Sequence, residues 1–292
     1  MRLIPYLALL LLPVLPLVQK RIDHRLGTFR VQHEALYLWS GEHVRRLTPG
    51  FENLMADVYW LRTVQYFGGQ RAFAQDKRFD LLGPLVNITT ALDPRLEIAY
   101  RYGATFLAEP WPMGAGKPEE AIALLRRGVA HNPGDWRLRQ DLGLFYFFFL
   151  NDGVRASEVL QQGAQLPGAP PFLKTLAAQV LMKGGERQSA KMLWQQIYEQ
   201  SEPGQLKDNA AFHLGQLQSL DSADALNAAS EEFARRAGRP PASLEELRRS
   251  GLTAAPIVDA ARTPFEYNVS TGKASFSPRS PIWRRELAKY GP

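Results

Sequence analysis

The stretch of sequence that decides the fold is residues 93–133, DPRLEIAYRYGATFLAEPWPMGAGKPEEAIALLRRGVAHNP. Small and apolar residues recur in both of its halves at intervals of three and four, the spacing of one face of a helix. The residues of this face are Ala99, Gly103 and Phe106, then Ala121, Leu124, Leu125 and Gly128. The pattern predicts one helix over 96–108 and a second over 119–130, whose small residues let the two backbones approach closely.

The pattern of two helices returns along the chain. Its units are marked by Asp93-Pro94, Asn132-Pro133, Pro170-Pro171 and Glu202-Pro203, and the second residues of these pairs are 39, 38 and 32 positions apart. Such a period is typical of stacked helix pairs, in which no pair can bury its apolar face alone. We therefore expect an all-α helix-pair solenoid over residues 49–237, ending in two helices over 208–220 and 223–237.

Three successive units resemble tetratricopeptide repeats, which combine a small residue and an aromatic on the first helix with small residues around a larger one on the second. The matching residues are Gly103, Phe106, Ala121, Leu125, Gly128 and Pro133, then Gly143, Tyr146, Ala156, Leu160 and Gly163, then Ala178, Leu181, Ala190, Trp194, Ile197 and Pro203. An insertion at Glu109–Gly116 departs from the family's pattern. The resemblance implies a right-handed superhelix whose concave groove binds peptides or protein segments.

The chain begins with an apolar run, Leu3–Val18, that follows Arg2 and ends at Gln19-Lys20-Arg21. Sixteen helical residues would span about 24 Å, less than the roughly 30 Å hydrocarbon core of a bilayer. No small-x-small cleavage site follows the run. We therefore expect residues 1–18 to be an uncleaved signal anchor, with a cleaved signal peptide as the alternative, and residues 19–48 to form a juxtamembrane linker.

Two features of this region predict opposite orientations in the membrane. Lys20, Arg21 and Arg25 outnumber the positive charges ahead of the apolar run, which by the positive-inside rule would keep the body in the cytoplasm. A charged start followed at once by an apolar run is instead typical of exported proteins. We favour export, with a single anchor in a bacterial-type inner membrane and the body in the periplasm.

The C-terminal segment, residues 238–292, has a different pattern. Ser243 followed three residues later by Glu246 is a capping box at the start of a short helix. Alternating residues over 265–269 and 273–277 flank Ser270-Thr271-Gly272 and predict a β-hairpin. The segment resembles the C-terminal part of type II secretion pseudopilins, without the pilin N-terminal helix. It is either a small module shared with them or a cap on the hydrophobic end of the solenoid.

Composition and motifs exclude several classes of function. The chain has no cysteine, so disulfides, thiolate metal sites, cysteine nucleophiles and a lipoprotein anchor are ruled out. The net charge of +6 is spread over 292 residues and predicts no nucleic-acid partner. The five histidines are scattered and no phosphate-binding loop is complete. We expect no metal, no cofactor, no small-molecule substrate and no enzymatic activity.

Protein binding is the function that remains. The first helix of each pair would line the groove, so aromatic and basic residues on these helices are candidate contacts, although aromatic residues at helical spacing are also typical of a core. The candidates are Tyr59, Arg62, Tyr66, Tyr100, Arg101, Arg139, Phe147 and Phe148. We expect a membrane-anchored scaffold or adaptor that binds another protein of an envelope assembly for secretion, pilus formation or transport. The alternative is a structural subunit built permanently into a membrane complex.

Overall fold

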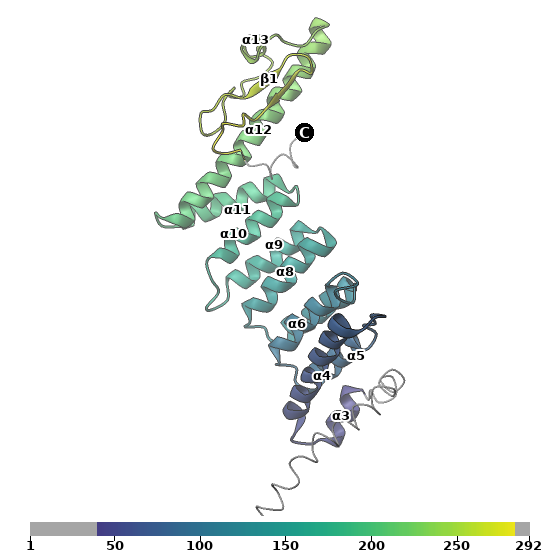
Figure 1. Ribbon diagram of the computed structural model, residues 1–292. Helices are drawn as coiled ribbons and strands as arrows, with labels where there is room; N and C mark the ends of the chain where they lie inside the picture. Colours follow the sequence, from purple (N-terminus) through teal and green to yellow (C-terminus); the bar gives the residue numbers. More distant parts are fainter. Residues whose placement is uncertain (1–39, 284–292) are drawn as a thin grey trace, which may run out of the picture. The chain divides into compact units, whose positions relative to one another are not determined.

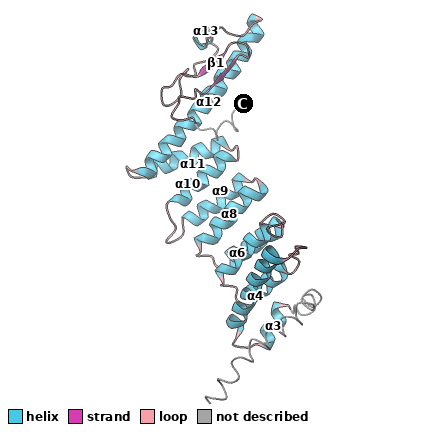
Figure 2. Cartoon of the chain, in the orientation of Figure 1, coloured by secondary structure: helices cyan, strands magenta, loops and turns pink. Residues whose placement is uncertain are grey.

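The computed structural model describes residues 40–283, and this part of the chain is almost entirely helical, with one small β-hairpin near its end (Figure 2). Within each unit, most helices pack against the next helix in the sequence, which confirms the expected packing of consecutive helix pairs. The chain divides into two compact units, the first up to Asn132 and the second from Pro133. The apolar run Leu3–Val18 lies outside the described residues.

The first unit contains five helices between residues 40 and 132 (Figure 1). Each of α4, α5 and α6 packs against the helix that follows it, and α3 packs on α5. Their bounds are α3 (Gly41–Leu47), α4 (Glu52–Phe73), α5 (Leu82–Leu92), α6 (Glu97–Ala108) and α7 (Pro118–His131).

Small residues set the close approach of these helices. A Cβ atom at Gly103 would lie 2.9 Å from Val86 Cγ1 on α5, and a Cβ at Gly128 would lie 2.8 Å from Tyr100 Cγ on α6. Either contact is shorter than van der Waals packing allows, so a larger residue at these positions would force the helices apart. The small residues predicted for this helix pair therefore lie at helix–helix contacts.

The end of the predicted juxtamembrane linker differs from expectation, because residues 41–47 form helix α3. Ser40 caps this helix by accepting a hydrogen bond from the His43 N–H at 3.4 Å. Val44 is buried against Ala56, Ile88 and Leu92. The stretch is rich in basic residues, and the single apolar residue that packs the helix against the core, Val44, did not stand out among them.

The second unit has six helices and a hairpin between residues 133 and 283 (Figure 1). Helices α8 to α12 pack in order, each against the next, and both α13 and the second strand contact α12. The bounds are α8 (Trp136–Leu150), α9 (Gly153–Ala164), α10 (Phe172–Lys183), α11 (Arg187–Gln200), α12 (Gln205–Ala237), α13 (Leu244–Arg249), β1 (Glu266–Asn268) and β2 (Lys273–Ser275).

Helix α12 is one continuous helix of 33 residues, so the prediction of two helices, over 208–220 and 223–237, was wrong. No glycine or proline interrupts the chain between Leu220 and Ala223. The Ser222 hydroxyl instead donates to the Gln218 carbonyl at 3.0 Å, one turn earlier in the same helix. The length of α12 matters because its second half supports the C-terminal segment.

The C-terminal segment folds back onto α12. Strands β1 and β2 pair antiparallel with Tyr267 opposite Ala274, which confirms the predicted hairpin. One half of the predicted capping box is present, because Ser243 Oγ accepts from the Glu246 N–H at 3.2 Å, whereas Glu246 Oε2 accepts at 2.5 Å from the N–H of Ala242, the residue before the cap. The core shared with α12 consists of Leu220, Ala223, Leu226, Ala229, Leu244, Leu247, Phe265, Ala274 and Phe276.

Candidate functional site

The first unit carries a cluster of aromatic rings that joins α4 to α6 and includes the start of the α5 region. The Phe67 and Phe106 rings stack with centroids 4.0 Å apart and planes 11° apart, and Trp60 is parallel to Phe106 at 6.1 Å. Phe79 is 5.7 Å from Phe67. Tyr102 completes the set at 6.5 Å from Phe106. We call these five residues the α4–α6 aromatic cluster.

The α4–α6 aromatic cluster runs from the core to the surface. Phe67 and Phe79 are buried, Trp60 and Phe106 are half-buried, and Tyr102 is 52% exposed. Ile98, one turn before Tyr102 on α6, is also exposed. A ring that contacts another aromatic ring on one side and is open to solvent on the other can pack against an apolar side chain of a partner.

Charged groups border this cluster. The Arg71 guanidinium lies 5.8 Å from the centroid of the Phe67 ring and forms an ion pair with Glu109 at 3.0 Å. Arg101 pairs with Glu97 at 3.2 Å along α6. Because these arginines are already paired with carboxylates, the surface around the cluster carries charges of both signs. The feature that distinguishes it is the group of aromatic rings.

The insertion between α6 and α7 is folded back onto the end of α6. The Ala115 and Lys117 N–H groups donate to the carbonyls of Phe106 and Leu107, at 3.1 and 2.7 Å. A Cβ at Gly114 would lie 2.8 Å from the Phe106 carbonyl oxygen, so the fold needs glycine there. The loop exposes the side chain of Trp111.

In the second unit, the phenylalanines of α8 lie at the end of the helix. Phe148 is 70% exposed and Phe147 is half-buried, with ring centroids 5.2 Å apart. The helix stops at Asn151, which adopts a left-handed conformation at φ 51°. Of the two phenylalanines proposed for the groove, Phe148 is therefore exposed at the surface and Phe147 is not.

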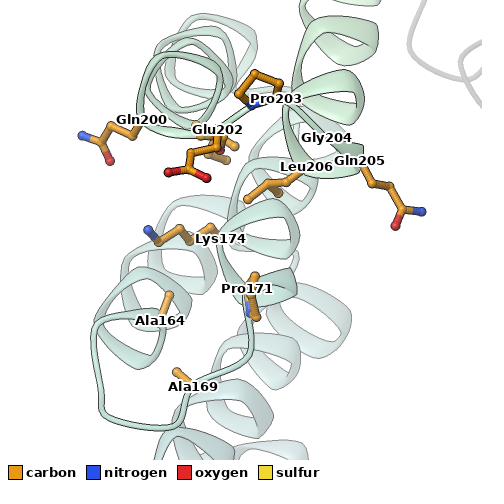
Figure 3. Close-up of a pocket in the computed structure, with 12 residues that line it drawn as sticks. Ala164, Ala169, Pro171, Lys174, Gln200, Glu202, Pro203, Gly204, Gln205 and Leu206 are labelled. Atoms are coloured by element: carbon orange, nitrogen blue, oxygen red, sulfur yellow. The ribbon is translucent and has the colours of Figure 1, made fainter.

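A pocket of about 540 Å³ lies in the second unit, among the ends of α9, α10 and α11 and the start of α12 (Figure 3). Lys174 and Glu202 are the charged side chains in its wall, and both are exposed. Gln200 and Gln205 point away from the pocket on opposite sides (Figure 3). Among the described residues that line the pocket, no buried polar side chain points into it. We therefore interpret the pocket as a space between helix ends.

The tyrosines predicted as groove contacts have structural roles in the first unit. Tyr59 is half-buried against the cluster of Val44, Ala56, Ile88 and Leu92. The Tyr66 hydroxyl donates to the Arg78 carbonyl at 2.7 Å and so fastens the chain that follows α4. Tyr100 is 1% exposed, and burial raises the pKa of its phenol.

The arginines predicted as groove contacts differ in their environments. Arg62 on α4 is exposed, whereas Arg101 is half-buried beside Glu97. Arg139, in the second unit, donates from Nη1 to the carbonyls of Pro133 and Asp135 at 2.7 and 3.3 Å, and so holds the chain at the start of α8. The predicted set is thus divided between the two units.

Tyr102 is the surface residue that the sequence analysis missed. It lies four residues after Ile98 and four before Phe106, on a row of α6 next to the row that carries the small residues Ala99 and Gly103. The sequence carries no local signal that could have found it, because Tyr100 and Tyr102 lie in the same turn of α6 and the neighbouring helices decide which of them is exposed.

Buried polar groups of the second unit are used by the fold. The His213 ring stacks on Trp194 at 4.4 Å, and its Nδ1 lies 2.7 Å from Gln216 Oε1. Asp259 accepts the N–H groups of Ala261 and Thr263 at 2.9 and 2.8 Å. Over residues 40–283, no group of histidine and acidic side chains is arranged to hold a metal ion, and no helix is long and apolar enough to cross a membrane.

No protein-family model, curated protein or solved structure matches this chain. The resemblance to tetratricopeptide repeats therefore rests on the residues of this chain and on the packing of its consecutive helices.

Proposed function

We propose that this protein is a membrane-anchored scaffold whose helical body binds a segment of another protein of the cell envelope. The observation that carries the proposal is the α4–α6 aromatic cluster, in which Tyr102 contacts the half-buried Phe106 ring at a tilted angle and is open to solvent. Aromatic residues of this kind dominate the energetics of protein interfaces. The packing of consecutive helix pairs supports a tetratricopeptide-like repeat, a fold class that presents extended binding surfaces.

The partner segment that suits this surface is apolar. Tyr102 and Ile98 are adjacent on the outward face of α6, and both are large and exposed. Arg71 on α4 and Arg101 on α6, which border the cluster, are already paired with Glu109 and Glu97. We therefore propose that an apolar side chain of the partner packs on Tyr102, with polar contacts around it.

Site-specific photo-crosslinking in the full-length chain tests this proposal. A benzophenone amino acid is placed at Tyr102, with the same substitution at Tyr198, an exposed tyrosine of α11, as the matched control. Irradiation of intact cells should give one discrete crosslinked protein at position 102, and Ile98→Glu should abolish it. Equal labelling from both positions, or insensitivity to Ile98→Glu, would remove the aromatic cluster from the proposed function.

The anchor is the second part of the proposal and is tested separately. If Leu3–Val18 holds the protein in the membrane, the full chain stays with membranes through carbonate and high-salt washes, and a chain without residues 1–18 is released. A reporter fused after Pro292 should be active outside the cytoplasm. A mature N-terminus near residue 19 would show that the run is a cleaved signal peptide.

The exposed Phe148 supports the alternative of a permanent structural subunit, because a large apolar side chain at the surface suits a stable interface. In that case Phe148→Ala should reduce the amount of protein that accumulates in cells, together with its partner. A scaffold that binds its partner reversibly would accumulate at the same level with or without this substitution.

A further inference from the structure

Helix α4 turns an apolar stripe toward solvent. Its buried residues are Ala56, Thr63 and Phe67, and on the opposite side Leu54, Val58 and Leu61 are 58%, 47% and 60% exposed. The outward face of a surface helix in a soluble domain is ordinarily polar. An apolar stripe of this length therefore indicates an interaction surface.

The stripe has the spacing of a coiled-coil seam. From Phe51, the outward residues follow at alternating intervals of three and four: Phe51, Leu54, Val58, Leu61, Gln65, Gly68 and Ala72. In heptad notation, Phe51, Val58, Gln65 and Ala72 occupy a positions and Leu54, Leu61 and Gly68 occupy d positions. A β-branched residue at a with leucine at d favours two parallel strands, and a polar residue at a fixes their register.

Two glycines inside α4 are not required by any packing contact within residues 40–283. A Cβ atom at Gly68 or Gly69 would meet nothing within 4 Å, and glycine in a helix interior weakens the helix. Gly68 lies on the seam, where the absence of a side chain would allow a second helix backbone to come close. The glycines thus point to a partner helix on this face.

Charges beside the seam fit a second copy of the same helix. Asp57 is at a g position and Arg62 at the following e position, five residues later, which is the pair that faces across a parallel two-stranded coiled coil. Both side chains are exposed, and neither forms an ion pair or hydrogen bond within residues 40–283. A symmetric dimer would form this pair twice.

We propose that the protein forms a parallel homodimer through the α4 seam, with Leu54, Val58 and Leu61 at its centre and Asp57 of each copy paired with Arg62 of the other. A two-fold axis makes such a contact self-complementary. The seam lies on the face of α4 opposite Thr63 and Phe67, away from the aromatic cluster, so the proposal does not depend on the proposed function. Two copies anchored by their N-termini in one membrane would also be parallel.

Disulfide trapping tests the seam, because the chain has no cysteine of its own. Leu54→Cys and Leu61→Cys are made separately in the full-length protein and oxidised in membranes. Met192→Cys on α11, where the native side chain is 68% exposed, is the control. Each seam variant should give a covalent dimer at several times the yield of the control. Disulfides between equal residues at both position 54 and position 61 require parallel helices, since a disulfide joins Cα atoms less than about 7 Å apart.

Exchanging the charges of Asp57 and Arg62 tests whether the partner helix is a second copy of α4. Asp57→Arg and Arg62→Asp should each reduce the crosslinking of Leu61→Cys severalfold, because like charges then face each other across the seam. The double exchange should restore it. Crosslinking of Leu61→Cys no greater than that of Met192→Cys, or a double exchange that behaves like either single one, would overturn the homodimer and leave lipid or another protein as the occupant of the stripe. Crosslinking from Tyr102 to a partner would be unaffected by that failure.

Discussion

Asn227 on α12 and Ala274 on β2 exchange two hydrogen bonds: Asn227 Oδ1 accepts from the Ala274 N–H at 2.7 Å, and Asn227 Nδ2 donates to the Ala274 carbonyl at 3.3 Å. The buried amide thus pairs with the outer edge of the hairpin as a neighbouring strand would. One turn along, the Ser230 hydroxyl donates to the Gly272 carbonyl at 2.7 Å, and Lys273 pairs with Glu231 at 2.6 Å. The C-terminal segment is therefore fastened to α12 by its backbone as well as by its apolar core.

Replacing Asn227 with alanine should lower the free energy of unfolding of the second unit by about 2 kcal/mol, because both backbone groups of Ala274 would stay buried without partners. Urea unfolding followed by circular dichroism measures this change. Gln218→Ala, at an exposed site on the same helix, serves as the control and should change stability by less than about 0.5 kcal/mol. An equal, small effect of both substitutions would contradict the bonding of Asn227 to β2.

Two glycines of the first unit should respond in opposite directions to alanine. At Gly128 the new Cβ would lie 2.8 Å from Tyr100 Cγ, so Gly128→Ala should cost about 1–3 kcal/mol of stability through overpacking. At Gly69 the new Cβ meets nothing within 4 Å, so Gly69→Ala should add about 1 kcal/mol through helix propensity. Thermal and urea melts of the two variants check the signs. Stabilisation by Gly128→Ala would mean that α6 and α7 are not in close contact there.

Helix pairs were predictable from the sequence because close packing requires small residues at fixed intervals, and Gly103 and Gly128 show that requirement locally. The contact of Asn227 with Ala274 joins residues 47 positions apart. Nothing near Asn227 distinguishes it from a polar residue on an exposed helix face. The prediction of two helices in place of α12 was wrong for a related reason. The apolar spacing before Leu220 and after Ala223 is the same for two short helices and for one continuous helix.

Whether a candidate groove residue is buried or exposed also could not be predicted from the sequence. Tyr59, Tyr66 and Tyr100 have helical spacing, which is common to aromatic residues of a core and of a binding surface. Only the tertiary packing separates Tyr100, which fills the space over Gly128, from Tyr102, which is exposed. The neighbours that decide between these environments come from other helices.

The carboxylate of Glu246 should titrate far below its ordinary range. The hydrogen bonds from Arg239 and from the Ala242 N–H lower its pKa from 4.5 to about 2. Because the pKa is depressed in the folded state, the stabilisation from this group is complete above the unfolded pKa of about 4.5 and is lost as the pH falls toward 2. A carboxyl-detected NMR titration measures the midpoint.

Arg239→Ala should move this midpoint upward, and added salt should move it in the same direction, since the pair is exposed and screened. A midpoint for Glu246 that Arg239→Ala leaves unchanged would rule out Arg239 as the main cause.

Tyr100 and Tyr102 give the last prediction, because they are two residues apart on α6 and differ in environment. Tyr100→Ala should lower the free energy of unfolding of the first unit by about 3–5 kcal/mol, since it leaves a cavity over Gly128. Tyr102→Ala should cost less than about 1 kcal/mol, because its ring is half in solvent. With the photo-crosslinking amino acid at Ile98, Tyr102→Ala should nevertheless remove most of the crosslinked partner while the protein stays folded and membrane-bound. Full crosslinking in the Tyr102→Ala protein would show that Tyr102 is an ordinary exposed side chain, and the binding surface would then have to lie elsewhere, with Phe148 on α8 as the next residue to test.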